Sequence, residues 1–209
     1  MLAARIGAAG GQAGQAAGLA VLLIFLLWRR EFDGVLDGIL YGAVVGLGFA
    51  MVENFFYFMD SSGNLMVIFL RSIVFGLNHA FFTAFTGAAL GLARQARWRH
   101  SWLLLFPLGL LAAITFHAIH NGSVSGGACA GLGVALVSDW GGVALIAVVA
   151  ILTWRQEKRW IQEELGEEVA AGLLAPSDLE ALLSLRRRVW ARSWTWRHRG
   201  WKAYRLLGQ

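Results

Sequence analysis

One apolar stretch, Leu36 to Met59, constrains the fold of this chain more than any other. It is long enough to cross a bilayer as a helix, because a hydrocarbon core of about 30 Å needs roughly 20 residues. It also carries a carboxylate, Glu53, and we place no other acidic residue of the chain inside hydrocarbon. A charge at this depth costs about 2.5–3.5 kcal/mol on insertion scales and usually marks a functional site. Glu53 is therefore either a site residue or a structural carboxylate that hydrogen-bonds a neighbouring helix.

The rest of the chain is equally apolar, with 57% apolar and only 15% charged residues among 209. Soluble domains carry more charge, so we expect an all-α, polytopic membrane helical bundle with a cytoplasmic helical tail. About five transmembrane helices are expected, at residues 10–28, 36–59, 73–92 and 102–121, with a last one that ends at 154. Arg71 interrupts the third, so residues 65–72 are placed at the interface. The sequence leaves open whether residues 128–137 belong to the last span or form a separate short helix.

The positive charges set the expected orientation. Eleven of the 18 Lys and Arg residues follow Trp154, and the connections at 29–30 and 94–99 are also basic. The connections at 60–64 and 122–140 contain no Lys or Arg. Because basic loops stay in the cytoplasm, we expect a multi-pass protein of the cell membrane with its N-terminus outside and its C-terminus cytoplasmic. The single cysteine, Cys129, rules out an internal disulfide and a cysteine-rich metal site.

We expect two domains, a transmembrane bundle with the site (residues 1–154) and a basic, Trp-rich tail (155–209). In the tail, Arg and Trp alternate from Arg186 onward. That mixture suits a helix on the inner leaflet, with cations on anionic headgroups and indoles just below them. The alternative is a charged helical hairpin that never touches lipid. Nucleic acid is not an expected partner.

Two histidines are expected at the same membrane depth as Glu53. His79 lies in the third span and His117 near the end of the fourth. With a helix rise of 1.5 Å per residue, all three fall at roughly 6–9 Å below the outer surface. Polar side chains at that depth face the bundle interior or a water-filled cavity. We therefore expect these three groups, from three separate helices, to converge on one site.

A carboxylate with two imidazoles is consistent with two kinds of hydrolytic chemistry. In the first, Glu53 is a general base that takes a proton from water while the imidazoles stabilise an oxyanion, and no cofactor is needed. In the second, Glu53, His79 and His117 bind a metal such as Zn²⁺. Asn121 shares a helix face with His117, whereas His120 is rotated from His117 by about 60°.

Three motifs together resemble the PrsW-type intramembrane proteases, a family distantly similar to the CAAX prenyl proteases. They are Phe49-Ala-Met-Val-Glu53, His79 in the next span, and His117-Ala-Ile-His-Asn121. The resemblance implies Glu53, His79, His117 and Asn121 as catalytic residues. It also implies an intramembrane protease that cleaves single-span membrane-associated proteins, such as an anti-sigma factor, near the extracytoplasmic face.

One motif of that family is missing from this chain. Alignment puts Ala13, Gly14 and Ala17 where the family has a Glu-Glu-x-x-Lys motif. Three explanations follow: an inactive paralogue, a sequence whose start is misassigned or truncated, or a family branch in which Glu53 serves as the base. The alternative function is therefore a catalytically inactive homologue that acts as a membrane binding or scaffold protein. A transporter is disfavoured because no inverted repeat is visible.

Overall fold

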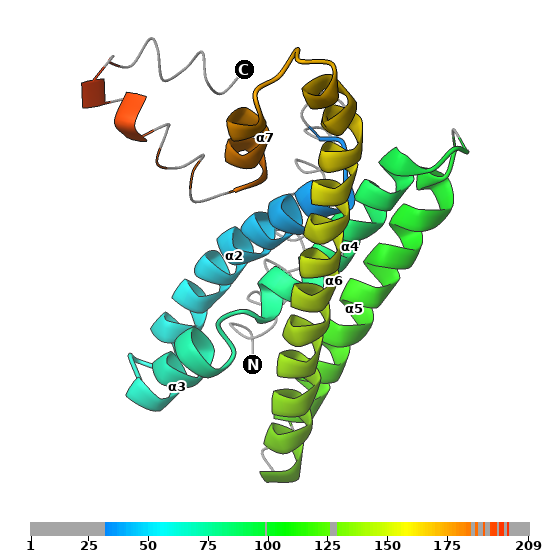
Figure 1. The fold of residues 1–209 in the computed structure, drawn as a ribbon. Coiled ribbons are helices and arrows are strands. Elements are labelled where there is room, and N and C mark those ends of the chain that lie inside the picture. The colour runs from blue at the N-terminus through cyan, green and yellow to red at the C-terminus, as the bar shows by residue number, and fades with distance from the viewer. Residues whose placement is uncertain are drawn as a thin grey trace. The chain divides into compact units, whose positions relative to one another are not determined.

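The structure is a computed structural model that describes residues 32–98, 100–125 and 129–184, with single positions between 187 and 200. These residues form helices and no strands, as expected for an all-α fold (Figure 1). The elements are, in order, α2 (Val35–Asp60), α3 (Leu65–Phe69), the π-helix η1 (Leu70–Val74), α4 (Asn78–Gln95), α5 (Trp102–Ser125), α6 (Cys129–Ala170) and α7 (Pro176–Leu183). The expected first span, at residues 10–28, lies outside the described part of the chain.

Four helical segments in the described part are long and apolar enough to cross a membrane. They are α2, residues 65–95, α5 and α6, and they confirm the expected polytopic helical bundle. The question about residues 128–137 is answered from Cys129 onward, because α6 starts there and runs without interruption to Ala170. This helix continues past Trp154 because the following residues are mostly strong helix formers such as Glu, Gln, Lys and Arg.

The chain divides into two compact units, residues 1–151 and residues 152–209. Within the first unit, α4 packs against both α2 and α5 (Figure 1). The assignment of the site to residues 1–154 and of a separate role to the tail at 155–209 stays a prediction.

Glycines bring α2 and α4 into backbone contact. Gly38, Gly42 and Gly46 are spaced four apart on α2 and lie on one face of the helix, turned toward α4. A Cβ atom on Gly46 would lie 2.0 Å from the backbone oxygen of His79, and one on Gly38 would lie 2.0 Å from that of Gly87. Small residues at such spacing let membrane helices approach closely and gain dispersion contacts. The position of His79 relative to α2 therefore depends on glycines.

Aromatic packing joins α6 to α4 and α5. The buried core contains Phe81 and Phe82 of α4 and Ile146 of α6, with Phe116 of α5 packed against them. Gly142 leaves room for this cluster, because a Cβ atom there would lie 2.3 Å from the Phe81 ring. Since lipid is as apolar as these side chains, close packing rather than the hydrophobic effect holds the helices together.

The third span is not one regular helix, which differs from the expectation that it begins near Ile73. The helix changes to π-helical geometry at η1, is interrupted at residues 75–77, and restarts with α4 at Asn78. The chain folds tightly at Gly76, where a Cβ atom would lie 2.2 Å from the oxygen of Ser72. Irregular helix of this kind often occurs at functional sites. Here it separates the segment that carries Arg71 from the helix that carries His79.

The glycine contact gives a first prediction. Gly46→Ala should lower the free energy of unfolding by about 1–3 kcal/mol, because the new methyl group collides with backbone atoms that cannot rotate away. Thermal unfolding in detergent micelles measures the effect. Gly48→Ala is the matched control, since its Cβ atom would meet nothing within 4 Å. Equal stability of the two variants would contradict the close packing of α2 on α4.

Candidate functional site

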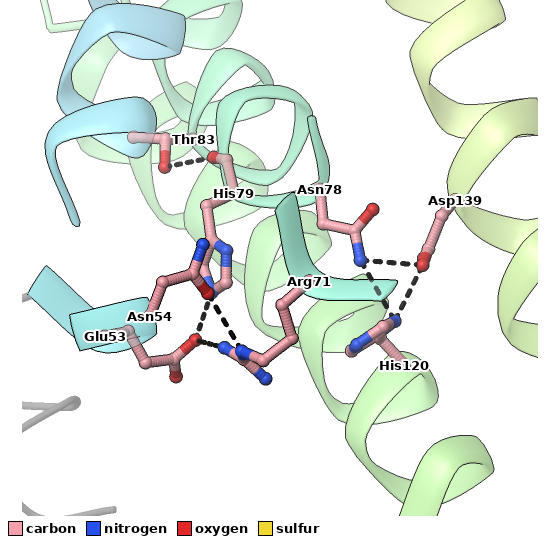
Figure 2. A network of polar contacts seen from close by, with 8 residues as sticks. All are labelled: Glu53, Asn54, Arg71, Asn78, His79, Thr83, His120 and Asp139. Atoms are coloured by element: carbon pink, nitrogen blue, oxygen red, sulfur yellow. Dashed lines mark hydrogen bonds and ion pairs between the residues drawn. The ribbon is translucent and has the colours of Figure 1, made fainter. Parts of the chain in front are cut away.

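Glu53, His79 and His117 come together in the structure from three helices, α2, α4 and α5. One potential ligand atom from each lies within 4.8 Å of the other two. The Nε2 atom of His79 is 3.2 Å from the Oε2 atom of Glu53, and the rings of His79 and His117 are 5.2 Å apart. Figure 2 shows the Glu53 carboxylate and the His79 ring pointing toward one another. The convergence expected from membrane depth is therefore present.

Aromatic rings fix the orientation of both imidazoles. Phe49 lies 4.9 Å from the His79 ring, and Phe82 meets the same ring edge-on at 5.7 Å. Phe82 also stacks on His117 at 5.2 Å with an interplanar angle of 15°. One phenylalanine thus contacts both histidine rings, so neither imidazole can rotate without moving a packed side chain.

Arg71 completes the group, although sequence analysis placed it at the membrane interface and outside the site. Its Nη2 atom donates to Oε2 of Glu53, and its Nε atom donates to Oδ1 of Asn54 at 2.8 Å (Figure 2). Its guanidinium also lies 3.6 Å from the centre of the Tyr57 ring, a cation–π contact. A signal was present in the sequence, because an arginine in an apolar segment needs a carboxylate partner and only Glu53 was expected at that depth.

A second polar group lies beside the first and was missed. It consists of Asn78 at the start of α4, His120 on α5 and Asp139 on α6, all buried. Oδ2 of Asp139 lies 2.6 Å from Nδ1 of His120 and accepts from Nδ2 of Asn78 at 2.8 Å (Figure 2). Asp139, 1% exposed, corrects the expectation that Glu53 is the only acidic residue within a membrane-spanning segment. The glycine-rich stretch before it had been assigned to a connection rather than to a helix.

Asn121 does not join either group. Its side chain is exposed on α5, while the preceding residue, His120, is 6% exposed. Consecutive helical residues point about 100° apart, so only one of the two can face the bundle interior. The catalytic role expected for Asn121 from its spacing to His117 stays a prediction.

The three convergent side chains fit a metal ion. Among the described residues, Nε2 of His79 has no hydrogen-bond partner, because its contact with Glu53 lacks hydrogen-bond direction. A buried lone pair aimed at a carboxylate oxygen suits a shared cation. Two imidazole nitrogens and one carboxylate oxygen form a donor set that zinc and other divalent transition metals accept, with ligand atoms roughly 3.5 Å apart around a tetrahedral ion. Three protein ligands would leave a fourth position open.

The ion pair at the site gives a second prediction. Arg71→Met should destabilise the protein by about 2 kcal/mol, because it leaves the Glu53 carboxylate without its cation. Removing one partner of a fully buried pair costs about 3–5 kcal/mol, and the discount reflects side chains that are still 20% and 16% exposed.

A double-mutant cycle with Glu53→Gln isolates this interaction. The double variant should lose less stability than the sum of the two single variants, as measured by thermal unfolding in micelles. Strictly additive losses would show that the two side chains do not stabilise one another.

Comparison with known proteins places the chain in a family. Residues 15–155 match the model of the PrsW family of intramembrane metalloproteases. A curated relative, "Protease PrsW" of Oceanobacillus iheyensis, is 33% identical over 92 residues, which cover 44% of this chain and 40% of the relative. The match thus spans less than half the length of that relative. No solved structure matches the chain. The family match covers more than half of the chain and includes the helices that bring Glu53, His79 and His117 together, so this protein belongs to the PrsW family of intramembrane metalloproteases.

Proposed function

We propose that this protein is an intramembrane metalloprotease that cleaves single-span membrane proteins. The observation that supports this most strongly is the convergence of Glu53, His79 and His117, one from each of three packed helices, within 4.8 Å. Peptide hydrolysis inside a membrane needs a polar site that holds water and is screened from lipid by helices. Two imidazoles and a carboxylate, held by aromatic rings and an arginine, meet that requirement.

Zinc is the metal we propose for this site, with Glu53, His79 and His117 as its ligands. Bound zinc supplies a Lewis acid for the scissile carbonyl group and a nucleophilic water at neutral pH. The protein's own part is orientation. Arg71 holds the Glu53 carboxylate, and Phe82 fixes both imidazole rings. Preorganised ligands of this kind lose little entropy when the metal binds.

The distribution of Lys and Arg supports a location for the reaction. If basic segments stay in the cytoplasm, the candidate site lies nearer the extracytoplasmic face of the cell membrane, with the N-terminus outside and the C-terminus inside. A substrate would then be a single-span protein cut close to that face. A membrane-anchored anti-sigma factor, the substrate suggested by the resemblance, has this form.

We also propose that the tail at residues 155–209 contacts anionic lipid headgroups. Its Lys and Arg residues are interspersed with tryptophans, a composition typical of surface-bound helices. At the start of this region the ammonium group of Lys158 lies 4.0 Å from the centre of the Trp154 ring. Such a pair can place its indole at the interface while its cation meets phosphate.

The second candidate function is a catalytically inactive scaffold that binds membrane proteins in the same cavity. The sequence at Ala13, Gly14 and Ala17 favours it, because acidic residues are absent where the family motif has a glutamate pair. The two functions differ in turnover, not in binding.

The test is cleavage of a defined reporter by the full chain in liposomes with zinc. The reporter has one leucine-rich span and an unstructured outer flank that carries a quenched fluorophore pair. Glu53→Gln should reduce cleavage at least about 100-fold, because it removes a metal ligand, and so should His79→Asn. Chelation should abolish cleavage, and added zinc should restore it.

Asp60→Asn, a carboxylate change at the end of the same helix, is the matched control and should leave cleavage unchanged. Full activity of Glu53→Gln would remove Glu53 from the mechanism. A wild-type chain that binds the reporter without cleaving it, with or without zinc, would establish the scaffold instead.

A further inference from the structure

The second polar group raises the question of which residue accepts a proton during hydrolysis, and this inference rests on the proposed function. The Glu53 carboxylate is already engaged by Arg71 and lies against His79. As a metal ligand it would have no free oxygen placed to act as a base as well. Among the described residues, the other buried carboxylate is Asp139, which is joined to the imidazole of His120.

The hydrogen bonds of Asp139 determine which nitrogen of His120 carries a proton. Asn78 can only donate through Nδ2, and it does so to Oδ2 of Asp139 at 2.8 Å. Nδ1 of His120, 2.6 Å from the same oxygen, must then donate as well, because an ionised carboxylate only accepts. In the neutral ring this leaves Nε2 with a lone pair. A carboxylate behind an imidazole fixes the tautomer and makes the far nitrogen more basic.

The far nitrogen is turned toward the candidate metal site. His120 follows His117 by three residues on α5, a spacing at which helical side chains are neighbours. The ring of Phe82 lies 5.2 Å from His117 and 6.4 Å from His120, so one side chain contacts both. In Figure 2 the Nδ1 end of the His120 ring meets Asp139 and Asn78, and its other end faces the side on which Arg71 lies.

We propose that His120 is a catalytic proton acceptor and donor of the hydrolytic reaction, and that Asp139 and Asn78 are its positioning residues. Nε2 of His120 takes a proton from water as the water oxygen adds to the scissile carbonyl carbon. The C–N bond then breaks, and the same nitrogen returns the proton to the leaving amine. Atoms and charge balance, and no further reactant is needed.

A purely structural role for these residues makes a different prediction. The hydrogen bonds of Asp139 connect α6 to α4 and α5, so they could serve only to hold the helices together. The adjacent Trp140 makes a comparable connection, because its Nε1 atom donates to the backbone oxygen of Val74 at 3.1 Å. Trp140→Phe removes this second connection of α6 and therefore serves as the matched control.

The experiment measures kcat, KM, zinc affinity and thermal unfolding for the full chain with the single-span reporter. His120→Gln should lower kcat by about 100-fold or more, with KM and the zinc Kd changed less than threefold. Asp139→Asn, which keeps the acceptor oxygen and loses the charge, should lower kcat by about 10-fold or more. Free imidazole should restore part of the activity of His120→Ala, and Trp140→Phe should retain the kcat of the wild type.

Three results would overturn the inference. The first is an unchanged kcat in His120→Gln while Glu53→Gln is inactive, which would leave the proposed function standing. The second is a loss of activity in His120→Gln and Asp139→Asn that tracks a loss of zinc affinity or of thermal stability, with no imidazole rescue, since a structural connection would behave in this way. The third is the absence of cleavage by the wild-type chain, which would overturn the proposed function as well.

Discussion

A carboxylate held inside a bundle of apolar helices is the constraint on which the rest of this structure depends. Glu53 cannot be ionised there without compensation, because lipid offers neither water nor counter-ions. The structure supplies a cation from Arg71 and an imidazole from His79, and it brings His117 next to them. A metal ion would add to the same balance of charge. The structural requirement of Glu53 and the chemical requirement of hydrolysis are therefore met by the same side chains.

Such compensation is possible only because the helices approach each other very closely. Gly46 allows α2 to contact the backbone of His79, and Gly42 does the same at the next turn of α4. Distances between polar groups on different helices follow from these contacts, since interhelical spacing depends on the smallest residues at the interface. Gly142 plays the corresponding part on α6, where it accommodates the Phe81 ring. Small residues thus place the large polar ones.

The two polar groups differ in what surrounds them. The group around Glu53 includes a cation, and Nε2 of His79 in it has no hydrogen-bond partner in the described part of the chain. The group around Asp139 is built from hydrogen bonds that each have a donor and an acceptor, although Oδ1 of Asp139 has no partner among the described residues. Buried carboxylates rarely leave an oxygen unpaired, and a water molecule beside Oδ1 would satisfy it. A site that needs water for hydrolysis could receive it along this polar path.

The sequence by itself determined the fold class and much of the site, because hydropathy follows from composition alone. Apolar runs of about 20 residues predicted the spanning helices, and equal depth predicted that Glu53, His79 and His117 would meet. Depth along a helix can be counted from the sequence, but rotation and helix continuity cannot. Only the tertiary structure decided that Arg71 reaches Glu53 from an irregular helix, and that His120 rather than Asn121 faces the interior. It also decided that Asp139 lies within a helix that packs on the bundle. Each of these depends on which face one helix presents to another, and close packing sets that face.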